Sequence, residues 1–221
     1  MNILTAMRTV AACLLVLSIA TLVVEAQSRQ RAAPQPATKT EPAKIECPHV
    51  LGDGVRSGLT FCDIWTGRES AAGAIVRLPP RRGPATLTFD LHNRQTYSAG
   101  LEKAGRAYTR TTATIGVLTL DEHLLSRAVI QTEFRGSHDL IDRIAANGRG
   151  DVKAVAPVGR ESISVEVPEG VEAVSLVGEK ASIRRIDGEE TISTPGRPVA
   201  IVSNVKIEYR PAPPRRPGRR R

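Results

Sequence analysis

The sequence has few aromatic residues and lacks the familiar motifs of catalytic and metal sites. Phe, Trp and Tyr together make up 3% of the 221 residues. The four histidines show neither i,i+4 spacing nor a His-Glu-x-x-His pattern, which excludes the common helical zinc site. No Gly-x-Ser-x-Gly turn and no glycine-rich phosphate loop that opens a helix is present. We therefore expect no catalytic activity, no metal and no cofactor.

A hydrophobic run long enough to span a membrane comfortably is also missing. The apolar run Val10–Val24 would measure about 22 Å as a helix, against roughly 30 Å for the hydrocarbon core. Arg8 precedes the run, and Val24-Glu25-Ala26 ends it with small residues where a signal peptidase reads the chain. We predict a signal peptide over residues 1–26, cleaved between Ala26 and Gln27, and a secreted or periplasmic protein.

Two alternatives to this interpretation remain open. The apolar run would act as an uncleaved anchor if the peptidase did not cut it. Alternatively, Val10-Ala11-Ala12-Cys13 resembles a lipobox, although most of the apolar run follows Cys13 rather than preceding it.

Cysteine is scarce, with three residues in the whole chain. Loss of the signal peptide would leave Cys47 and Cys62, an even pair in an oxidising compartment, which favours a disulfide. A redox or metal pair would need Cys-x-x-Cys spacing or histidines close by, and in the sequence only His49 is near.

The net charge of +8 does not come from the central part of the chain. Residues 44–210 carry 22 Lys and Arg against 21 Asp and Glu, so this part is nearly neutral. A specific nucleic-acid partner is not expected, since such domains carry a basic face of their own. Residues 27–43 are rich in Pro and Ala and predict a disordered linker, and residues 211–221 predict a disordered tail.

The tail carries a cluster of basic side chains: Arg215, Arg216, Arg219, Arg220 and Arg221. We hypothesise that these arginines hold the protein weakly and reversibly on an anionic surface. The alternative is an end that aids solubility and has no partner.

Between the two ends, apolar and polar residues alternate with a period of two. The clearest segments are 85–92, 161–167 and 198–210, and this pattern is typical of antiparallel strands with one buried face. Further strands are expected at 59–65, 73–78, 108–120, 126–134, 152–156, 171–177 and 181–187, with a bulge near Gly116.

One short helix is expected near residues 137–147. Ser137 can cap it, several apolar residues would share one face, and Asn147-Gly148 would end it. Many strands and one helix predict an all-β protein whose residues 44–210 form an antiparallel β-sandwich, immunoglobulin-like or jelly-roll.

The candidate ligand-binding residues are Asp90, His92, Arg94 and Tyr97. Asp90 and His92 would project from the polar face of one strand, Arg94 follows at its end, and Tyr97 lies in a turn. The alternatives are an ordinary polar strand face and, for Tyr97 as for Tyr108, a ring that packs against the core.

The sequence thus predicts an exported, non-catalytic protein with a binding or structural role at the cell envelope. Its partner would be an envelope protein or a polysaccharide. A carbohydrate-binding module is the first alternative, because sandwich domains hold sugars on aromatic rings. A secreted hydrolase with carboxylates scattered along the sequence is the second.

Overall fold

Most of the described chain lies in antiparallel strands. The structure is a computed structural model that describes residues 37–145 and 153–213. Within these ranges the strands are β1 (Lys39–Pro42), β2 (Lys44–Glu46), β3 (Val50–Asp53), β4 (Thr60–Trp65), β5 (Ala74–Arg77), β6 (Arg81–Thr96), β7 (Thr109–Thr119), β8 (Leu124–Phe134), β9 (Val155–Val167), β10 (Ala173–Arg185), β11 (Gly188–Ile192) and β12 (Pro198–Pro211). The short helices are η1 (Ser70–Ala72), α2 (Ala99–Lys103) and η2 (Ser137–Asp139). No helix in the two ranges is long and apolar enough to span a membrane.

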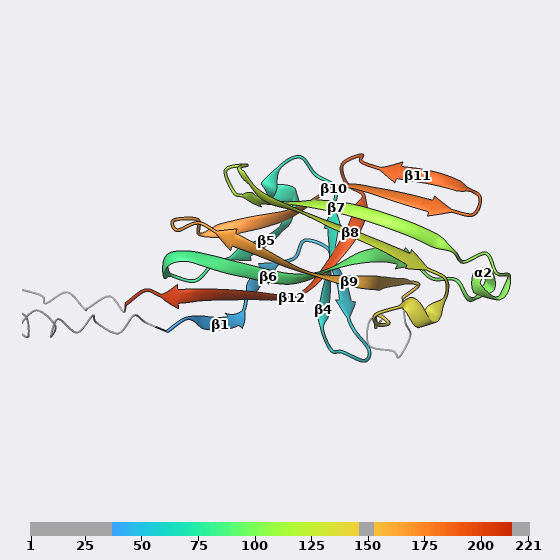
Figure 1. Ribbon diagram of the computed structural model, residues 1–221, viewed down its shortest axis with the longest axis horizontal. Helices are drawn as coiled ribbons and strands as arrows, with labels where there is room; N and C mark the ends of the chain where they lie inside the picture. The colour runs from blue at the N-terminus through green and yellow to red at the C-terminus, as the bar shows by residue number, and fades with distance from the viewer. Residues whose placement is uncertain (1–36, 146–152, 214–221) are drawn as a thin grey trace, which may run out of the picture. The chain divides into compact units, whose positions relative to one another are not determined.

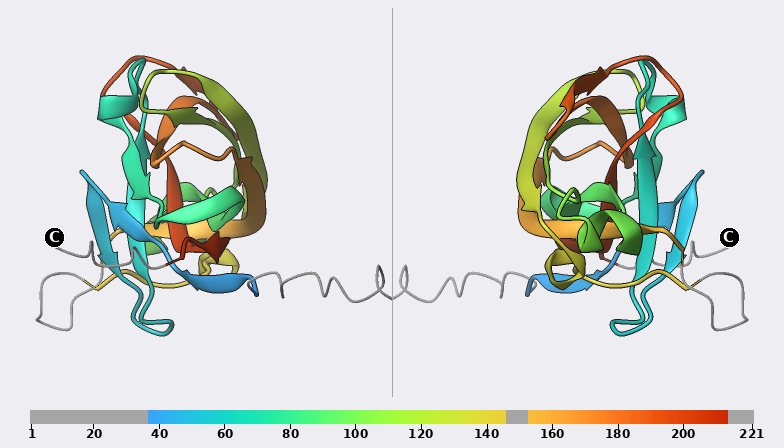
Figure 2. Two further views of the ribbon diagram at one scale, coloured as in Figure 1. Left: turned by 90° about the vertical axis from the view of Figure 1, so that its left-hand side faces the viewer. Right: turned by 90° about the vertical axis from the view of Figure 1, so that its right-hand side faces the viewer.

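The described strands form two six-stranded sheets, which lie as facing layers in Figures 1 and 2. In the first sheet the order is β3-β4-β12-β6-β9, and β1 also pairs with β12. In the second sheet the order is β2-β5-β10-β7-β8, and β11 also pairs with β10. Each of these pairings is antiparallel. The arrangement confirms the predicted all-β sandwich.

The core lies between the two sheets. β6 contributes the residues that the alternating pattern predicted, Ala85, Leu87, Phe89 and Leu91. The second sheet contributes Ala113, Ile115 and Val117 from β7 and Val174 and Leu176 from β10. Burial of each large apolar side chain of this kind stabilises the folded state by about 1.5–3 kcal/mol.

The predicted disulfide is confirmed, and it joins the two sheets. Cys47 directly follows β2 in the second sheet, while Cys62 lies within β4 of the first. Their Cα atoms are 5.9 Å apart. Because β2 is three residues long and lies at the edge of its sheet, the disulfide fixes this short strand to the opposite layer.

Two of the strands are longer than the sequence predicted. The segments expected at 152–156 and 161–167 belong, from Val155 on, to the single strand β9. In the same way, the segments expected at 171–177 and 181–187 merge into β10, whose pairing with β7 shifts register between Gly178 and Lys180. In both cases, two apolar runs separated by a glycine belong to one continuous strand with an irregularity, not to two strands.

The irregularity predicted near Gly116 is present in β7. Its pairing with β8 shifts register between Val117 and Leu118. Leu118 is partly exposed, whereas Val117 is fully buried in the core.

The helix predicted near 137–147 is wrong. Residues Ser137–Asp139 form only the single turn η2, the chain then runs in an extended path to Ala145, and residues 146 and 147 lie outside the described chain. The carboxylate of Asp142 accepts hydrogen bonds from the backbone N–H groups of Arg56 (3.1 Å) and Ser57 (2.7 Å).

Apolar contacts stabilise the same extended path. Ile144 is completely buried in a second apolar cluster, which also contains Leu51, Phe61 and Ile201. The segment before residue 146 therefore covers the outer face of the first sheet. Contacts distant in sequence outweigh the local preference for a helix, which is only a few tenths of a kcal/mol per residue.

The boundaries of the domain also differ from the prediction. Residues 39–42, expected within the disordered linker 27–43, form strand β1 and pair with Lys206–Tyr209 of β12. At the other end, Pro211 still pairs with Arg81 as the last residue of β12, although the tail was expected to begin there. The polar segment 39–42 therefore belongs to the first sheet because its backbone pairs with β12, although its side chains give no strand pattern.

Candidate binding pocket

Asp90 and His92 lie on the outer face of the first sheet, and both are buried there. The Nδ1 atom of His92 lies 2.6 Å from the Gly159 carbonyl oxygen, and its Nε2 atom lies 2.9 Å from Ser203 Oγ. The carbonyl can only accept, so Nδ1 carries the proton and Nε2 accepts from the hydroxyl. Asp90 accepts a hydrogen bond from Asn204 Nδ2 at 3.1 Å. These side chains bind neighbouring strands.

Burial lowers the pKa of His92 below its usual value of 6.5, partly offset by the Gly159 carbonyl. The ring is 1% exposed and packs edge-on against Phe61, with ring centroids 5.7 Å apart. His92 is therefore held neutral at neutral pH.

Arg94 forms an ion pair with Asp63 of β4. Its Nε atom lies 3.2 Å from Asp63 Oδ1, and both side chains are largely buried. Burial raises the pKa of the Asp63 carboxyl, while the nearby guanidinium acts in the opposite direction. Arg94 is the one member of the predicted set that also lines the pocket described below.

The side chain of Tyr97 is partly buried at the edge of the domain rather than fully exposed in a turn. The Arg143 guanidinium lies 4.2 Å from the centre of its ring, and the ring contacts the small cluster of Ala107, Phe134 and Val158. The structure therefore does not bring Asp90, His92, Arg94 and Tyr97 together in one site. Ala26, Gln27 and the five tail arginines lie outside the described residues, and their roles remain predictions.

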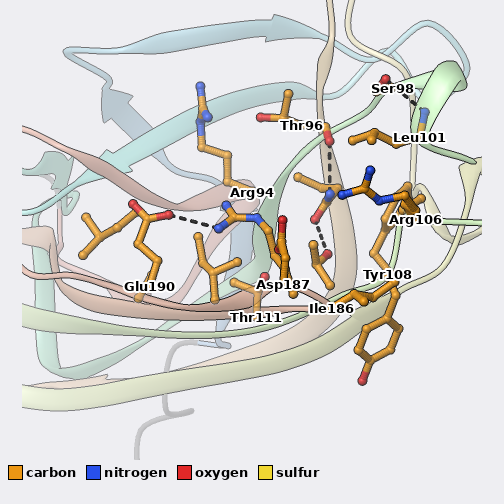
Figure 3. A pocket seen from close by; sticks show the side chains of 18 of the residues that line it. Arg94, Thr96, Ser98, Leu101, Arg106, Tyr108, Thr111, Ile186, Asp187 and Glu190 are labelled. Atoms are coloured by element: carbon orange, nitrogen blue, oxygen red, sulfur yellow. Dashed lines mark hydrogen bonds and ion pairs between the residues drawn. The ribbon is translucent and has the colours of Figure 1, made fainter.

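A pocket of about 410 Å³ lies at the end of the sandwich that carries α2 and the β10–β11 hairpin (Figure 1), and Figure 3 shows its lining side chains. It is formed by the end of β6, helix α2 and the turn after it, the start of β7, the hairpin of β10 and β11, and the start of β12. The volume lies in the range of about 300–1,000 Å³ that is typical of small-ligand sites.

The floor of this pocket is apolar and buried. It is made by Ala107, Phe134, Ala181 and Val199, each at most 8% exposed. Ile183 and Ile192 of the hairpin are partly exposed and form one wall. An apolar group of a ligand could leave water here without disturbing the core.

Arginines surround the mouth of the pocket. Arg185 is held by Glu190 at 3.1 Å and Arg94 by Asp63, whereas Arg106 and Arg197 make no ion pair with any described residue. Both of these are exposed. In Figure 3 the side chain of Arg106 reaches from the turn after α2 toward the middle of the pocket.

Hydrogen bonds fix the segments that carry these groups. Thr66 Oγ1 contacts the backbone oxygens of Thr194 (2.5 Å) and Arg197 (3.1 Å), so the turn before β12 is held in place. On the opposite side, Thr109 Oγ1 donates to Gln95 Oε1 at 2.8 Å, and Ser98 caps α2.

A second, more open hollow of about 470 Å³ lies beside Trp65. The Trp65 ring stacks on His49, with centroids 3.8 Å apart and planes 12° apart. Pro48, Ala71 and Pro195 complete its mainly apolar lining, and Arg68 and Glu69 stand at its edge.

Groups that would support catalysis do not converge in the sandwich-end pocket. Its acidic lining residues, Asp187 and Glu190, come from one hairpin, and Glu190 is paired with Arg185. Within residues 37–145 and 153–213 no three His, Cys, Asp or Glu side chains are grouped so that they could hold a metal ion.

No protein-family model matches the sequence, and no curated protein matches it. Among solved structures, the K1 cleaved adhesin domain of Lys-gingipain from Porphyromonas gingivalis W83 is similar over 80% of this chain and 99% of that chain, at 9% identity and a TM-score of 0.35. The T13 IBDV viral particle matches at 10% identity and a TM-score of 0.20, and the VP2 subviral particle of infectious bursal disease virus at 12% and 0.19. This chain covers 41% and 43% of those two chains.

These likenesses are too weak to bear on function. The strands, the disulfide and the pocket define an all-β sandwich with a disulfide between its sheets and a pocket lined by residues of both sheets.

Proposed function

We propose that this is an exported, non-catalytic binding protein that takes a small ligand into the pocket at the end of the sandwich. The observation that carries the proposal is the buried apolar floor of Ala107, Phe134, Ala181 and Val199, which opens to the outside through a fixed mouth. Concave sites of this kind, with apolar walls and a few polar groups, are the usual form of small-ligand sites.

Two features support export. The apolar run Val10–Val24 ends in Val24-Glu25-Ala26, with small residues at the two positions that a signal peptidase reads, and the domain contains the disulfide between Cys47 and Cys62. Disulfides persist in secreted and periplasmic proteins and are rare in reducing compartments. In such a location the protein would act at the cell envelope. It would bind an envelope protein or a polysaccharide there, or carry a small ligand in its pocket.

The pocket is tested with a neutral fluorescent probe, N-phenyl-1-naphthylamine, which brightens when it leaves water. We expect saturable binding to the wild-type protein. Ile183→Trp should weaken this binding about tenfold or more, because Ile183 forms a wall of the pocket and the indole would fill it.

The matched control is Val129→Trp, which adds the same ring at a β8 position that is 52% exposed and does not line the pocket. Its affinity should equal that of the wild type, and circular dichroism confirms that both variants fold. Absence of saturable probe binding to the wild type, or equal affinities in the two variants, would refute the proposed site.

A carbohydrate-binding role is the second candidate, and the hollow beside Trp65 favours it. An indole face is a flat apolar platform on which sugar rings stack, and Arg68 and Glu69 stand close enough to the hollow to bind hydroxyl groups. Trp65 is the single tryptophan of the chain, so its fluorescence reports on this hollow alone.

Titration with soluble chito-oligosaccharides should then change the emission of Trp65, and Ala71→Gln at the edge of the hollow should weaken the effect. If the emission stays constant up to millimolar oligosaccharide while the naphthylamine probe still binds, the sandwich-end pocket is the functional site and the carbohydrate role is rejected.

A further inference from the structure

We infer that the ligand of the sandwich-end pocket is a single-chain amphiphile with one anionic head group. Its chain would lie on the apolar floor, and its head group would be bound by Arg106 and Arg197 at the mouth. The inference rests on the proposed function and adds the chemical class of the ligand.

The first support is the separation of apolar and charged groups by depth. Phe134, Ala181 and Val199 are at most 2% exposed and lie at the bottom, whereas Arg106, Arg185 and Arg197 are exposed. A purely polar ligand would leave the floor without a partner. A purely apolar ligand would lie against guanidinium groups at the mouth and gain nothing from them.

The second support is the charge that remains at the mouth after the ion pairs are counted. The lining contains Arg94, Arg106, Arg185 and Arg197 against Asp187 and Glu190, a net charge of +2, which the carboxylate of Asp63 beside Arg94 reduces to +1. Asp63 offsets Arg94, and Glu190 offsets Arg185. The charges of Arg106 and Arg197 are not offset by a described ion-pair partner.

The third support is the placement of these two arginines. Arg106 stands in the turn after α2, where its backbone N–H donates to the Leu101 oxygen at 2.9 Å. Arg197 stands in the turn before β12, and its backbone N–H donates to Thr66 Oγ1 at 3.0 Å. Fixed backbones at two different segments of the mouth present two guanidinium groups, which bind carboxylate or phosphate oxygens in a forked geometry.

One acidic group at the mouth argues against a large or multiply charged anion. Asp187 is exposed at the tip of the β10–β11 hairpin and lines the pocket. Its carboxylate would repel a second negative charge on the ligand, so the mouth fits one anionic head group rather than a polyanion.

The test compares four ligands with the same ten-carbon chain: decanoate, decyl phosphate, decanol and decyltrimethylammonium. Each displaces the naphthylamine probe from the wild-type protein. The comparison is made at about pH 5.5, where decyl phosphate carries mainly one negative charge because its second pKa lies near 6. We expect both anions to bind about a hundredfold more tightly than decanol, and the cation more weakly than decanol. The two anions separate a carboxylate source from a phosphate source.

The variants Arg106→Gln and Arg197→Gln, alone and combined, identify the groups responsible. Each should weaken decanoate about tenfold and leave decanol unchanged, and the double variant should bind both equally. The control is Arg160→Gln, an exposed arginine outside the pocket lining, which should change neither affinity. Raising the salt concentration should weaken only the anions.

The outcomes separate this inference from the proposed function. If decanol binds as tightly as decanoate, or if the double variant keeps the preference for anions, the assignment of the head group is overturned while the pocket stands. If no ten-carbon compound displaces a probe that does bind, the ligand class is wrong. If the probe itself does not bind, the proposed function fails as well.

Discussion

Asn93 of β6 donates a hydrogen bond from its Nδ2 atom to the backbone oxygen of Thr111 in β7, 2.9 Å away, and so links the two sheets through the core. The same nitrogen lies 2.9 Å from Thr132 Oγ1 in β8. Asn93 is 1% exposed, so water does not compete for these contacts.

Replacing Asn93 with Leu should therefore lower the free energy of unfolding by about 1–3 kcal/mol, because the partners of the amide stay buried without their donor. Urea denaturation followed by circular dichroism measures the change. The control is Gln131→Leu at an exposed position on β8, which should shift stability by less than about 0.5 kcal/mol. Equal stability of the two variants would show that the link across the core is dispensable.

The buried ring of His92 should make stability depend on pH. Because burial lowers its pKa in the folded state, the unfolded chain gains a proton near pH 6.5 that the folded chain does not. The free energy of unfolding should fall as the pH drops from about 6.5 toward the lowered pKa. His92→Gln should remove this slope above pH 5, whereas His123→Gln, at an exposed side chain, should keep it.

Urea midpoints measured between pH 7.5 and 5 test this prediction. The range stays above the titration of ordinary carboxyl groups, which lies near pH 4. A slope in the His92→Gln protein as steep as in the wild type would mean that another group causes it.

Loss of the disulfide should destabilise the domain by about 2–5 kcal/mol. The double variant Cys47→Ala with Cys62→Ala avoids an unpaired thiol and keeps a small apolar side chain at the buried position of Cys62. Chemical denaturation of this variant and of the oxidised wild type gives the difference. Two alkylatable thiols in the unreduced mature protein would contradict the bond.

The sequence predicted the strands well where one face of the strand is buried and the other is exposed to solvent. Ala85, Leu87, Phe89 and Leu91 alternate because β6 lies over the core, and this periodicity is a local property. The helix near 137–147 failed for the opposite reason. The path of that segment depends on contacts of Asp142 and Ile144 with residues more than fifty positions away in the sequence, which no local pattern records.

The pocket could not be predicted from the sequence. The turns that hold Arg106 and Arg197 are visible as short polar segments, but their meeting at one mouth depends on strand order. Asp90 and His92 were expected on a solvent-exposed strand face, and both are buried there, where Ser203 and Asn204 of β12 bind them. Only Arg94 was both predicted and found at the pocket.

Export processing gives a further prediction. The mature protein should begin at Gln27, because Val24-Glu25-Ala26 places small residues at the cleavage positions. N-terminal sequencing of the exported protein checks this directly. Recovery of intact Met1 in the membrane fraction would instead favour an uncleaved anchor.

The tail arginines predict weak binding to anionic vesicles, at about 1 kcal/mol per basic residue near the bilayer. Co-sedimentation should decline with rising salt and disappear when the chain is truncated after Pro213, which leaves β12 intact. If the truncated and full-length proteins sediment alike at every salt concentration, the tail does not act as a tether.

The position of β12 also sets the order in which the protein can assemble. This strand is the last in the described sequence, yet it lies between β4 and β6 and pairs with β1, the first. Until residues 198–211 emerge from the ribosome, β3 and β4 have no neighbour that joins them to β6. During synthesis the first sheet must therefore wait for the end of the domain before its strands can all pair. Pairing over such sequence distances is slow, so we expect this sheet to form after synthesis of the domain rather than during it.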